Sequence, residues 1–177
     1  MMIFQAASAD RYEEILRLYE QVICQLEKDG ICIYWDLDTY PSRAYFARAI
    51  EQGELYIALE EGVVVAAAVL DHHARPEYVQ VPWQVQANEK EALIMHVLGV
   101  SPNARGRGVA RFMLESMKQL CRERGLRALR LDALTCNAPA CALYRRAGLT
   151  PVARRMFCIP DVGDEDFEVF EYVTKND

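Results

Sequence analysis

The stretch that decides the fold is Val100-Ser101-Pro102-Asn103-Ala104-Arg105-Gly106-Arg107-Gly108-Val109-Ala110. It joins an apolar segment, Ala92 to Val100, which predicts a strand, to a segment whose apolar residues recur at helical spacing. Two glycines two residues apart at such a turn let the backbone approach a ligand closely. The unpaired N–H groups and the positive dipole end of the following helix suit a phosphate. The stretch therefore predicts either a phosphate-binding loop or a tight turn.

Two common phosphate-binding motifs do not fit this stretch. The dinucleotide fingerprint needs a third glycine in the first βαβ unit of a parallel sheet, and Ala110 falls one residue short of that position. The P-loop needs Gly-Lys-Ser/Thr, which does not follow Gly108. A different phosphate-binding family is required.

Apolar periodicity outward from this stretch predicts the element order β-α-α-β-β-β-α-β-α-β-β. Helices are expected over 15–26, from the N-cap Ser42 to Glu51, over 109–121 and over 139–147, and strands over 3–6, 55–59, 63–70, 92–100, 126–131, 151–159 and 167–173. Glu60-Glu61-Gly62 signals a hairpin, and the loop Asp71–Glu89 is expected to hold a short strand. The order predicts an α+β (mixed α/β) fold, with helices packed on a central sheet in a single domain over 1–177.

The composition indicates one domain of ordinary size and argues against a membrane protein or a zinc-binding protein. The chain has 177 residues and 52% apolar residues, enough for one sizeable core. Its longest apolar run, Val63–Leu70, has eight residues, whereas a membrane helix needs about 20. Six cysteines without a Cys-x-x-Cys pair give no zinc pattern and indicate mostly buried thiols. We therefore expect a cytoplasmic protein with no metal and no membrane partner.

The charge is distributed unevenly along the chain. Between Ser101 and Arg155 there are twelve basic and three acidic residues, while the rest of the chain carries eight basic and 23 acidic residues. Such asymmetry suggests that the basic part faces a polyanion, which could be nucleic acid or a phosphorylated cofactor. The alternative is that the arginines form solvated helix faces. No nucleic-acid-binding module is recognised in the sequence, so no nucleic-acid partner is expected.

Two motifs resemble those of the GNAT N-acetyltransferase superfamily. Arg105-Gly106-Arg107-Gly108-Val109-Ala110 resembles its Arg/Gln-x-x-Gly-x-Gly/Ala signature, in the same place after a strand. The segment from Asn137 to Leu149 resembles Asn-x-x-Ala-x-x-Leu-Tyr-x-x-x-Gly-Phe, with Leu149 in place of the aromatic residue. The close resemblance covers roughly residues 92–150. It implies a central, mostly antiparallel, twisted sheet of about seven strands flanked by about four helices.

The earlier part of the chain is also similar to a group of bacterial GNAT proteins. The shared residues are Trp35, Tyr40-Pro41 and Gly53-Glu54-Leu55-Tyr56. The resemblance leaves open a homodimer, in which the strands over 151–159 and 167–173 could form the contact.

The resemblance implies transfer of an acetyl group from acetyl-CoA to a primary amine, by direct attack in a ternary complex. The expected cofactor-binding residues are Leu98, Val100, Arg105, Gly106, Arg107, Gly108, Val109, Ala110, Asn137 and Tyr144. The loop amides would hold the pyrophosphate, and the main chain at Leu98 and Val100 would pair with the pantetheine arm. Asn137 would bond the pantetheine, be the N-cap before Pro139, or do both.

Tyr144 and His96 are the expected catalytic residues. A phenol near the sulfur could protonate the departing thiolate, although a tyrosine at this place could also be core packing. The amine must lose a proton, and His96 is a candidate base that by alternation shares a face with Ile94 and Leu98. A hydrogen-bonded core histidine is the alternative for His96.

Other bases stay open at this point. They are the pair His72 and His73, and ordered water relaying a proton to Glu54 or Asp71.

For the acceptor, we expect a small molecule or a peptide amine. Trp35, Tyr40 and Tyr78 are the candidate pocket residues, and Asp36 and Asp38 could attract a cationic amine or form a solvated turn. A non-catalytic acyl-CoA sensor with the same fold is the alternative function.

Overall fold

A computed structural model describes residues 1–31 and 33–175, so Cys32, Asn176 and Asp177 lie outside the described residues. The elements are β1 Met2–Ala6, α1 Tyr12–Lys28, α2 Arg43–Glu51, β2 Leu55–Glu60, β3 Val63–Asp71, β4 Ala92–Val100, α3 Val109–Glu123, β5 Ala128–Leu134, α4 Ala138–Arg146, β6 Thr150–Ile159 and β7 Gly163–Val173. Short 3-10 turns, η1 Ala9–Arg11, η2 Pro76–Gln80, η3 Glu89–Glu91 and η4 Pro102–Ala104, complete the list. The order of helices and strands expected from the sequence is confirmed.

The seven strands form one sheet in the order β1-β2-β3-β4-β5-β7-β6. The pairs β1–β2, β2–β3, β5–β7 and β6–β7 are antiparallel. The pair β4–β5 is parallel, and its register joins Ala92–Ile94 to Ala128–Arg130. A mixed α/β fold with a mostly antiparallel sheet is therefore confirmed.

The chain forms two compact units. Unit 1 consists of Met1–Leu70 and Met95–Met113, and unit 2 consists of Asp71–Ile94 and Leu114–Asp177. The boundaries fall inside β3, just before its last residue, inside β4 and inside α3, so each of these elements contributes to both units. Each unit is described separately below.

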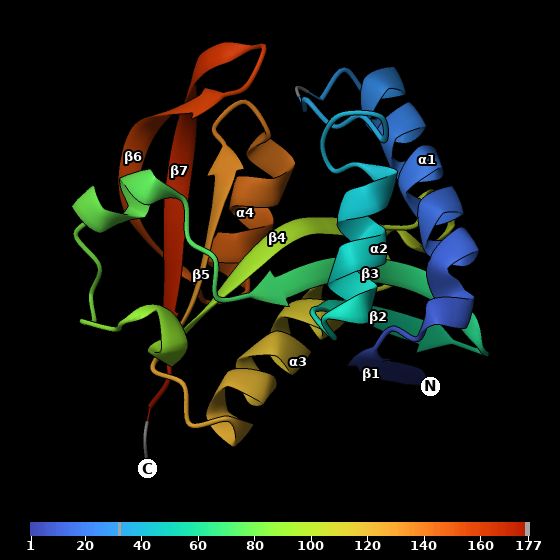
Figure 1. Cartoon of the computed structure of the whole chain (residues 1–177), viewed down its shortest axis with the longest axis horizontal. Helices are drawn as coiled ribbons and strands as arrows, with labels where there is room; N and C mark the ends of the chain where they lie inside the picture. Colours follow the sequence, from blue (N-terminus) through green and yellow to red (C-terminus); the bar gives the residue numbers. More distant parts are fainter. Residues whose placement is uncertain (32, 176–177) are drawn as a thin grey trace. The chain divides into compact units, whose positions relative to one another are not determined.

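The core of unit 1 lies between two helices and the strands that they cover. α1 and α2 lie side by side over the same face of β2 and β3 (Figure 1). The apolar stripe expected on α1 is buried there, with Ile15 and Tyr19 fully inaccessible. The ring of Tyr19 stacks on Phe46 of α2 at 4.2 Å between centroids. This packing holds α1 in place through area burial, worth about 25 cal/mol per Å².

A helix cap and a hairpin turn in unit 1 form where the sequence predicts them. The Ser42 hydroxyl accepts a hydrogen bond from the Tyr45 N–H at 3.1 Å and caps α2. Glu61 and Gly62 have φ values of 52° and 82°, and this pair of positive angles matches the right-handed twist of the β2–β3 hairpin. Ser42 and Glu61-Gly62 thus fix the start of α2 and the register of the hairpin.

The segment before β4 in unit 2 holds no strand, which corrects the expectation for Asp71–Glu89. It contains the turns η2 and η3, and Pro76 at the first position of η2 has no N–H for a sheet ladder. The segment is anchored instead by the buried Arg130 of β5, whose guanidinium lies 4.2 Å from the Trp83 ring centroid and donates to the Val85 carbonyl at 2.8 Å. Side-chain anchoring of this kind replaces backbone pairing.

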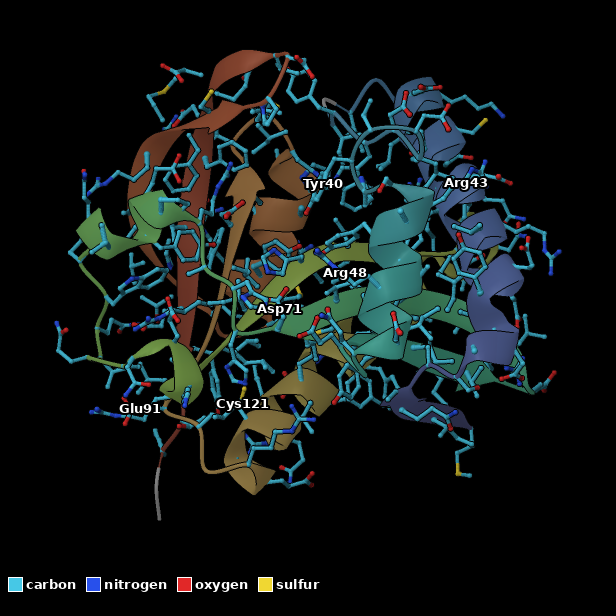
Figure 2. The ribbon with its side chains drawn as sticks, viewed as in Figure 1. Tyr40, Arg43, Arg48, Asp71, Glu91 and Cys121 are labelled. Carbon is cyan, nitrogen blue, oxygen red and sulfur yellow. The ribbon has the colours of Figure 1, made fainter. Side chains whose placement is uncertain are left out.

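Burial of the thiols differs from the expectation. Among the five described cysteines, Cys121 and Cys141 are buried, while Cys24, Cys136 and Cys158 are exposed. Cys24 lies on α1, Cys136 lies between β5 and α4, and Cys158 lies on the edge strand β6. Figure 2 labels Cys121 on α3.

No helix within residues 1–31 and 33–175 is long and apolar enough to cross a membrane.

Candidate functional site

The expected phosphate loop in unit 1 connects β4 to α3 through η4. Gly106 and Gly108 have φ values of 75° and 79°, a conformation that side-chain-bearing residues rarely adopt. A Cβ built on either glycine meets no atom within 4 Å. The glycines are therefore required by the backbone conformation, and open space lies beside the loop where a ligand could approach.

The amides of this loop are free to bind an acceptor. Within the part of the chain that the structure describes, the N–H groups of Gly106, Gly108, Val109 and Ala110 have no hydrogen-bond partner. The first internal bond of α3 runs from the Phe112 N–H to the Gly108 carbonyl at 2.9 Å. Unpaired N–H groups at the positive end of a helix form a ready site for an anion.

The arginines of the loop are engaged by acidic side chains, which sequence reasoning did not reveal. Arg105 forms an ion pair with Asp29 just after α1, and the hydrogen bond from Arg105 lowers the pKa of the Asp29 carboxyl. Arg107 Nη2 lies 2.5 Å from Glu60 Oε2 at the end of β2. Arg111 is exposed and has no ion-pair partner among the described residues. The positive charge of the loop is thus partly compensated from two other elements.

The second half of β4 is shaped by Tyr19 of α1. Val97 has a φ of 50°, and the Tyr19 hydroxyl, at 2.7 Å from the Val97 carbonyl, donates to it while also lying 3.1 Å from the Ala67 carbonyl. A Cβ on Gly99 would lie 3.0 Å from the Tyr19 ring, so any other residue there would crowd the ring. Leu98 therefore lies next to a break in the regular pleat that Tyr19 stabilises.

The strand residues expected to line the site remain accessible. His96, Leu98 and Val100 are half-buried and alternate with the buried Val97 and Gly99. Leu98 and Val100 lie beyond the three-residue β4–β5 ladder. His96 and Leu98 are thus both half-buried, whereas Ile94 is only 2% exposed, and the positive φ of Val97 interrupts the simple alternation expected between His96 and Leu98.

Of the other two histidines, His72 is held by its ring. Its Nδ1 lies 2.9 Å from the Glu89 carbonyl and 2.7 Å from the Ala92 carbonyl, within unit 2. His73 is exposed, and its backbone N–H donates to Asp71 Oδ1 at 2.8 Å. His72 thus anchors the segment before β4, and His73 belongs to a surface turn.

Asn137 in unit 2 acts as the N-cap of α4. Its Oδ1 accepts a hydrogen bond from the Ala140 N–H at 3.2 Å, and Pro139 occupies an early position of the helix. The amide Nδ2 of the half-buried Asn137 remains available to a ligand acceptor, since the cap uses only the oxygen.

Tyr144 of α4 is buried, with 7% of its surface exposed. Its ring packs edge-on against Phe170 at 5.5 Å, and burial, followed by the nearby Cys141 and Asp132, raises the pKa of its phenol well above the ordinary value. Its hydroxyl has no hydrogen-bond partner within the described part of the chain. Every side-chain oxygen of the described residues that is fully shielded from solvent has a hydrogen-bond partner. Since the Tyr144 oxygen has none, it keeps some exposure to solvent.

The candidate acceptor residues of unit 1 lie between α1 and α2. Trp35 is half-buried and tilts against Tyr19 at 6.0 Å, and it packs on the core. Tyr40, labelled in Figure 2, is 46% exposed and tilts against Tyr45 at 5.4 Å. Tyr40 therefore offers the more accessible ring of the two.

Asp36 in the same segment forms a local turn. Its Oδ1 accepts from the Asp38 N–H at 2.6 Å, and its own N–H donates to the Tyr40 carbonyl at 2.8 Å. Asp36 and Asp38 are exposed, so the structure favours the solvated-turn interpretation for them.

Tyr78 in unit 2 is 4% exposed and its hydroxyl donates to Asp132 Oδ2 at 2.6 Å. Burial, together with the Asp132 charge, raises the pKa of this phenol. Arg75 stacks over Phe157 with 4.7 Å to the ring centroid and lies 3.9 Å from Asp132 Oδ1. This placement makes Tyr78 a packing and anchoring residue and does not favour direct contact with an acceptor.

No group of three or more His, Cys, Asp or Glu side chains that could hold a metal ion is found among residues 1–31 and 33–175.

The curated relatives are acetyltransferases that match a short segment. Over 59 residues, or 33% of this chain, the sequence is 42% identical to a mycothiol acetyltransferase of Beutenbergia cavernae. A match of the same length and identity is found with a streptothricin acetyltransferase of Escherichia coli. The matches cover 20% and 33% of these relatives, so the chain spans about a fifth and a third of their length.

Similarity of fold extends over nearly the whole chain. A GNAT-family acetyltransferase from Streptococcus agalactiae has a TM-score of 0.81 at 19% identity, with 99% of this chain and 96% of that one covered. The ribosomal-protein-S18-alanine N-acetyltransferase of Escherichia coli has a TM-score of 0.68 at 19% identity, with 98% and 94% covered. A Salmonella typhimurium acetyltransferase solved with acetyl-CoA has a TM-score of 0.66 at 17% identity, with 97% and 93% covered.

The model of the acetyltransferase (GNAT) family matches residues 12–149, well over half of the sequence. This range includes the phosphate loop with its free amides and the helix that carries Tyr144. The chain therefore belongs to the acetyltransferase (GNAT) family.

Proposed function

We propose that the protein transfers an acetyl group from acetyl-CoA to a primary amine of a small molecule or a peptide, by direct attack in a ternary complex. The observation that carries this proposal is the row of unpartnered amides at Gly106, Gly108, Val109 and Ala110 beside open space. Membership of the acetyltransferase (GNAT) family supports it. Acetyl-CoA supplies the acetyl group as a reactive thioester.

The phosphate loop would bind the pyrophosphate. Backbone N–H groups at a helix N-terminus stabilise an anion by direct hydrogen bonds and by the helix dipole. Arg105 and Arg107 would exchange their ion pairs with Asp29 and Glu60 for phosphate oxygens. Since these pairs are exposed, the exchange costs little.

The main chain and Asn137 would bind the pantetheine arm. Leu98 and Val100 lie beyond the β4–β5 ladder, which fits a role for their backbone groups in pairing with an extended amide-containing ligand. Asn137 keeps its Nδ2 donor while its oxygen caps α4.

Tyr144 would act as the general acid. The raised pKa of its phenol keeps the hydroxyl protonated at neutral pH, and the oxygen is accessible and without a protein partner. As the amine nitrogen bonds to the carbonyl carbon and the carbon–sulfur bond breaks, Tyr144 would give its proton to the departing sulfur. The loop or strand N–H groups would stabilise the charge that builds on the carbonyl oxygen.

His96 would accept the proton that the amine loses. It is half-buried, as Leu98 is, whereas the Nδ1 atom of His72 contacts two backbone carbonyls. Water relaying the proton to Glu54 or Asp71 is the competing route, and His96→Asn separates the two. If His96 is the base, the variant loses most of kcat with little change in KM for acetyl-CoA. If a water relay operates, kcat stays close to that of the wild type.

Trp35 and Tyr40 would contact the acceptor, and Tyr78 would hold the segment before β4. The names of two relatives, a streptothricin acetyltransferase and a ribosomal-protein-S18-alanine N-acetyltransferase, indicate acceptors of both proposed kinds. The acidic surplus outside 101–155 favours a cationic amine.

The test is calorimetric titration with acetyl-CoA followed by a thiol-release assay over a panel of amines. We expect micromolar binding that is lost in an Arg107→Glu/Gly108→Glu variant, together with release of free CoA for at least one amine. Binding without turnover over the whole panel would favour a non-catalytic acyl-CoA sensor. No binding by the folded wild-type protein would reject the proposal.

A further inference from the structure

Unit 1 contains a groove of about 400 Å³ that shares only Arg107 with the residues proposed to bind acetyl-CoA. It is bounded by one face of α1, by the first residues of β3 and by the turn η4. We call it the α1 groove. Its floor is apolar, because Leu18, Val65 and Ala104 line it and are 4%, 8% and 2% exposed.

Several polar side chains without protein partners converge on this apolar floor. Arg17 and Gln21 lie one helical turn apart on α1, and Asn103 lies on η4. All three are exposed and make no hydrogen bond or ion pair with any residue that the structure describes. Such groups give a ligand both charge and orientation.

Ser101 supplies a second, independent observation. It is 8% exposed and stands at the N-cap of η4, yet its side chain makes no capping bond. Its side chain has no other partner within residues 1–31 and 33–175. Every side-chain oxygen of these residues that is fully shielded from solvent does have a hydrogen-bond partner. The Ser101 hydroxyl therefore keeps some exposure to solvent, and because Ser101 lines the groove, a ligand atom there could satisfy it.

The charge balance of the groove favours an anion. Its one carboxylate, Glu14, is already occupied, since Oε1 accepts from the Val64 N–H at 2.7 Å and Oε2 pairs with Arg11 at 2.7 Å. Arg107 also lines the groove but pairs with Glu60. The guanidinium with a free donor fork is that of Arg17, which suits a planar or tetrahedral anion.

We propose that the α1 groove is a second ligand site, for a small organic anion whose carboxylate or phosphate binds Arg17 and whose compact apolar body rests on the Leu18 floor. Ser101 and Asn103 orient the ligand by hydrogen bonds. The site does not rest on the proposed function. One consequence does rest on it: because Arg107 belongs to both the groove and the phosphate loop, an anion in the groove weakens acetyl-CoA binding severalfold.

The test uses phenyl phosphate as the probe, followed by amide chemical shifts in isotope-labelled protein. Inorganic phosphate serves as the charge-only control and benzyl alcohol as the body-only control. We expect shifts at Leu18, Ser101 and Asn103, and affinity about tenfold weaker for each control. Arg17→Ala should weaken phenyl phosphate binding about tenfold, because it removes the charge-assisted bond. Arg48→Ala, an exposed arginine of α2 outside the groove, should leave it unchanged (Figure 2).

The phosphate loop is the competing place for this probe. Gly108→Asn tests it, since asparagine tolerates a positive φ and adds a side chain where open space lies. Shifts confined to Gly106–Ala110 that Gly108→Asn abolishes and Arg17→Ala spares would overturn the proposal. Absence of groove shifts at about 10 mM probe would overturn it as well.

A separate titration keeps this result distinct from the proposed function. Acetyl-CoA is titrated into wild-type protein with and without saturating phenyl phosphate. If acetyl-CoA fails to bind in both cases, the proposed function fails while the shifts at Ser101 still report on the groove. If acetyl-CoA binds equally tightly in both, the coupling through Arg107 is rejected.

Discussion

At the scale of single residues, Tyr144 combines a buried ring with a hydroxyl that has no protein partner among the described residues. A tyrosine used only for packing would normally direct its hydroxyl to a protein acceptor, as Tyr78 does to Asp132 and Tyr19 does to Val97. Tyr144 has no such acceptor within the described residues, although its ring packs on Phe170. This difference among three buried tyrosines is what supports a chemical role for Tyr144.

Tyr144→Phe should lower kcat about 100-fold with little change in KM for acetyl-CoA, because the ring packing stays while the proton donor is lost. The raised pKa of the phenol means that wild-type activity should show no alkaline limb from Tyr144 below about pH 10. Steady-state kinetics across pH checks both points. Tyr172→Phe, a tyrosine whose oxygen accepts from Arg122 at 2.6 Å, is the matched control. Full activity in Tyr144→Phe would remove it from the mechanism.

The thiols of Cys121 and Cys141 should be inert toward disulfide reagents in the native state. Burial raises the pKa of Cys121 to about 12, and burial followed by the Glu168 charge raises that of Cys141 to about 11. The thiolate is the reactive form, so almost none is present at pH 8. In a timed reaction with Ellman's reagent, Cys158→Ala should remove one rapid equivalent and Cys121→Ala should remove none. Loss of a rapid equivalent in Cys121→Ala would contradict the burial.

At the scale of elements, the spacing of apolar residues and the residues typical of caps and turns predict much of the structure. The helical stripe of α1, the Ser42 cap and the Glu61-Gly62 turn all depend on local sequence, and all are confirmed. The strand expected before β4 is wrong because its anchors, such as Arg130, come from distant β5. Side-chain contacts between distant segments have no periodic signal.

In the candidate site, too, features set by nearby sequence could be predicted, and features set by residues far away in the sequence could not. The positive φ of Gly106 could be predicted because glycine readily adopts such an angle. The positive φ of Val97 could not be predicted, because a β-branched residue rarely adopts a positive φ. The Val97 carbonyl accepts a hydrogen bond from the hydroxyl of Tyr19, 78 residues away in sequence, and this contact stabilises the conformation. The acidic partners Asp29 and Glu60 likewise lie far from the loop arginines in sequence.

Ser42→Ala should reduce the free energy of unfolding by about 1 kcal/mol, because the N–H of Tyr45 loses its cap. Ser42→Asp, which restores an acceptor, should recover most of this loss. Urea unfolding followed by circular dichroism measures both variants. Equal stability of Ser42→Ala and wild type would mean that water satisfies the Tyr45 amide as well as the hydroxyl does.

At the scale of the whole molecule, acetyl-CoA binding and folding are linked. A ligand that binds only the native state adds about 2.7 kcal/mol at a concentration 100 times its Kd. For a chain of 177 residues, this should raise Tm by several degrees, at about 2–4 °C per kcal/mol. A thermal-shift series checks it, with Gly108→Asn as the variant in which the shift should shrink. A Tm that does not respond to acetyl-CoA would argue against native-state binding.

The buried phenols should also make the protein sensitive to alkali. Burial raises the pKa of Tyr19, Tyr78 and Tyr144 in the folded state. Their contribution to stability is complete below the unfolded pKa of about 10 and is lost as pH rises toward the higher folded values. Urea midpoints should therefore be flat from pH 7 to 9 and fall above about pH 10. In Tyr78→Phe the fall should be shallower, and an unchanged slope would contradict the assignment.

The path of the chain through its two units has a consequence for any attempt to take them apart. The backbone passes from one unit to the other after Leu70, Ile94 and Met113, and these passages lie inside β3, β4 and α3. A protease that cuts once, at any site, therefore leaves at least one unit made of two separated peptides. Neither unit can be expressed as one uninterrupted fragment, and swapping one for its counterpart from a relative would require exchanging alternate stretches of the gene. Recombination between genes of family members is therefore expected to keep the two units of one parent together and to exchange the whole chain.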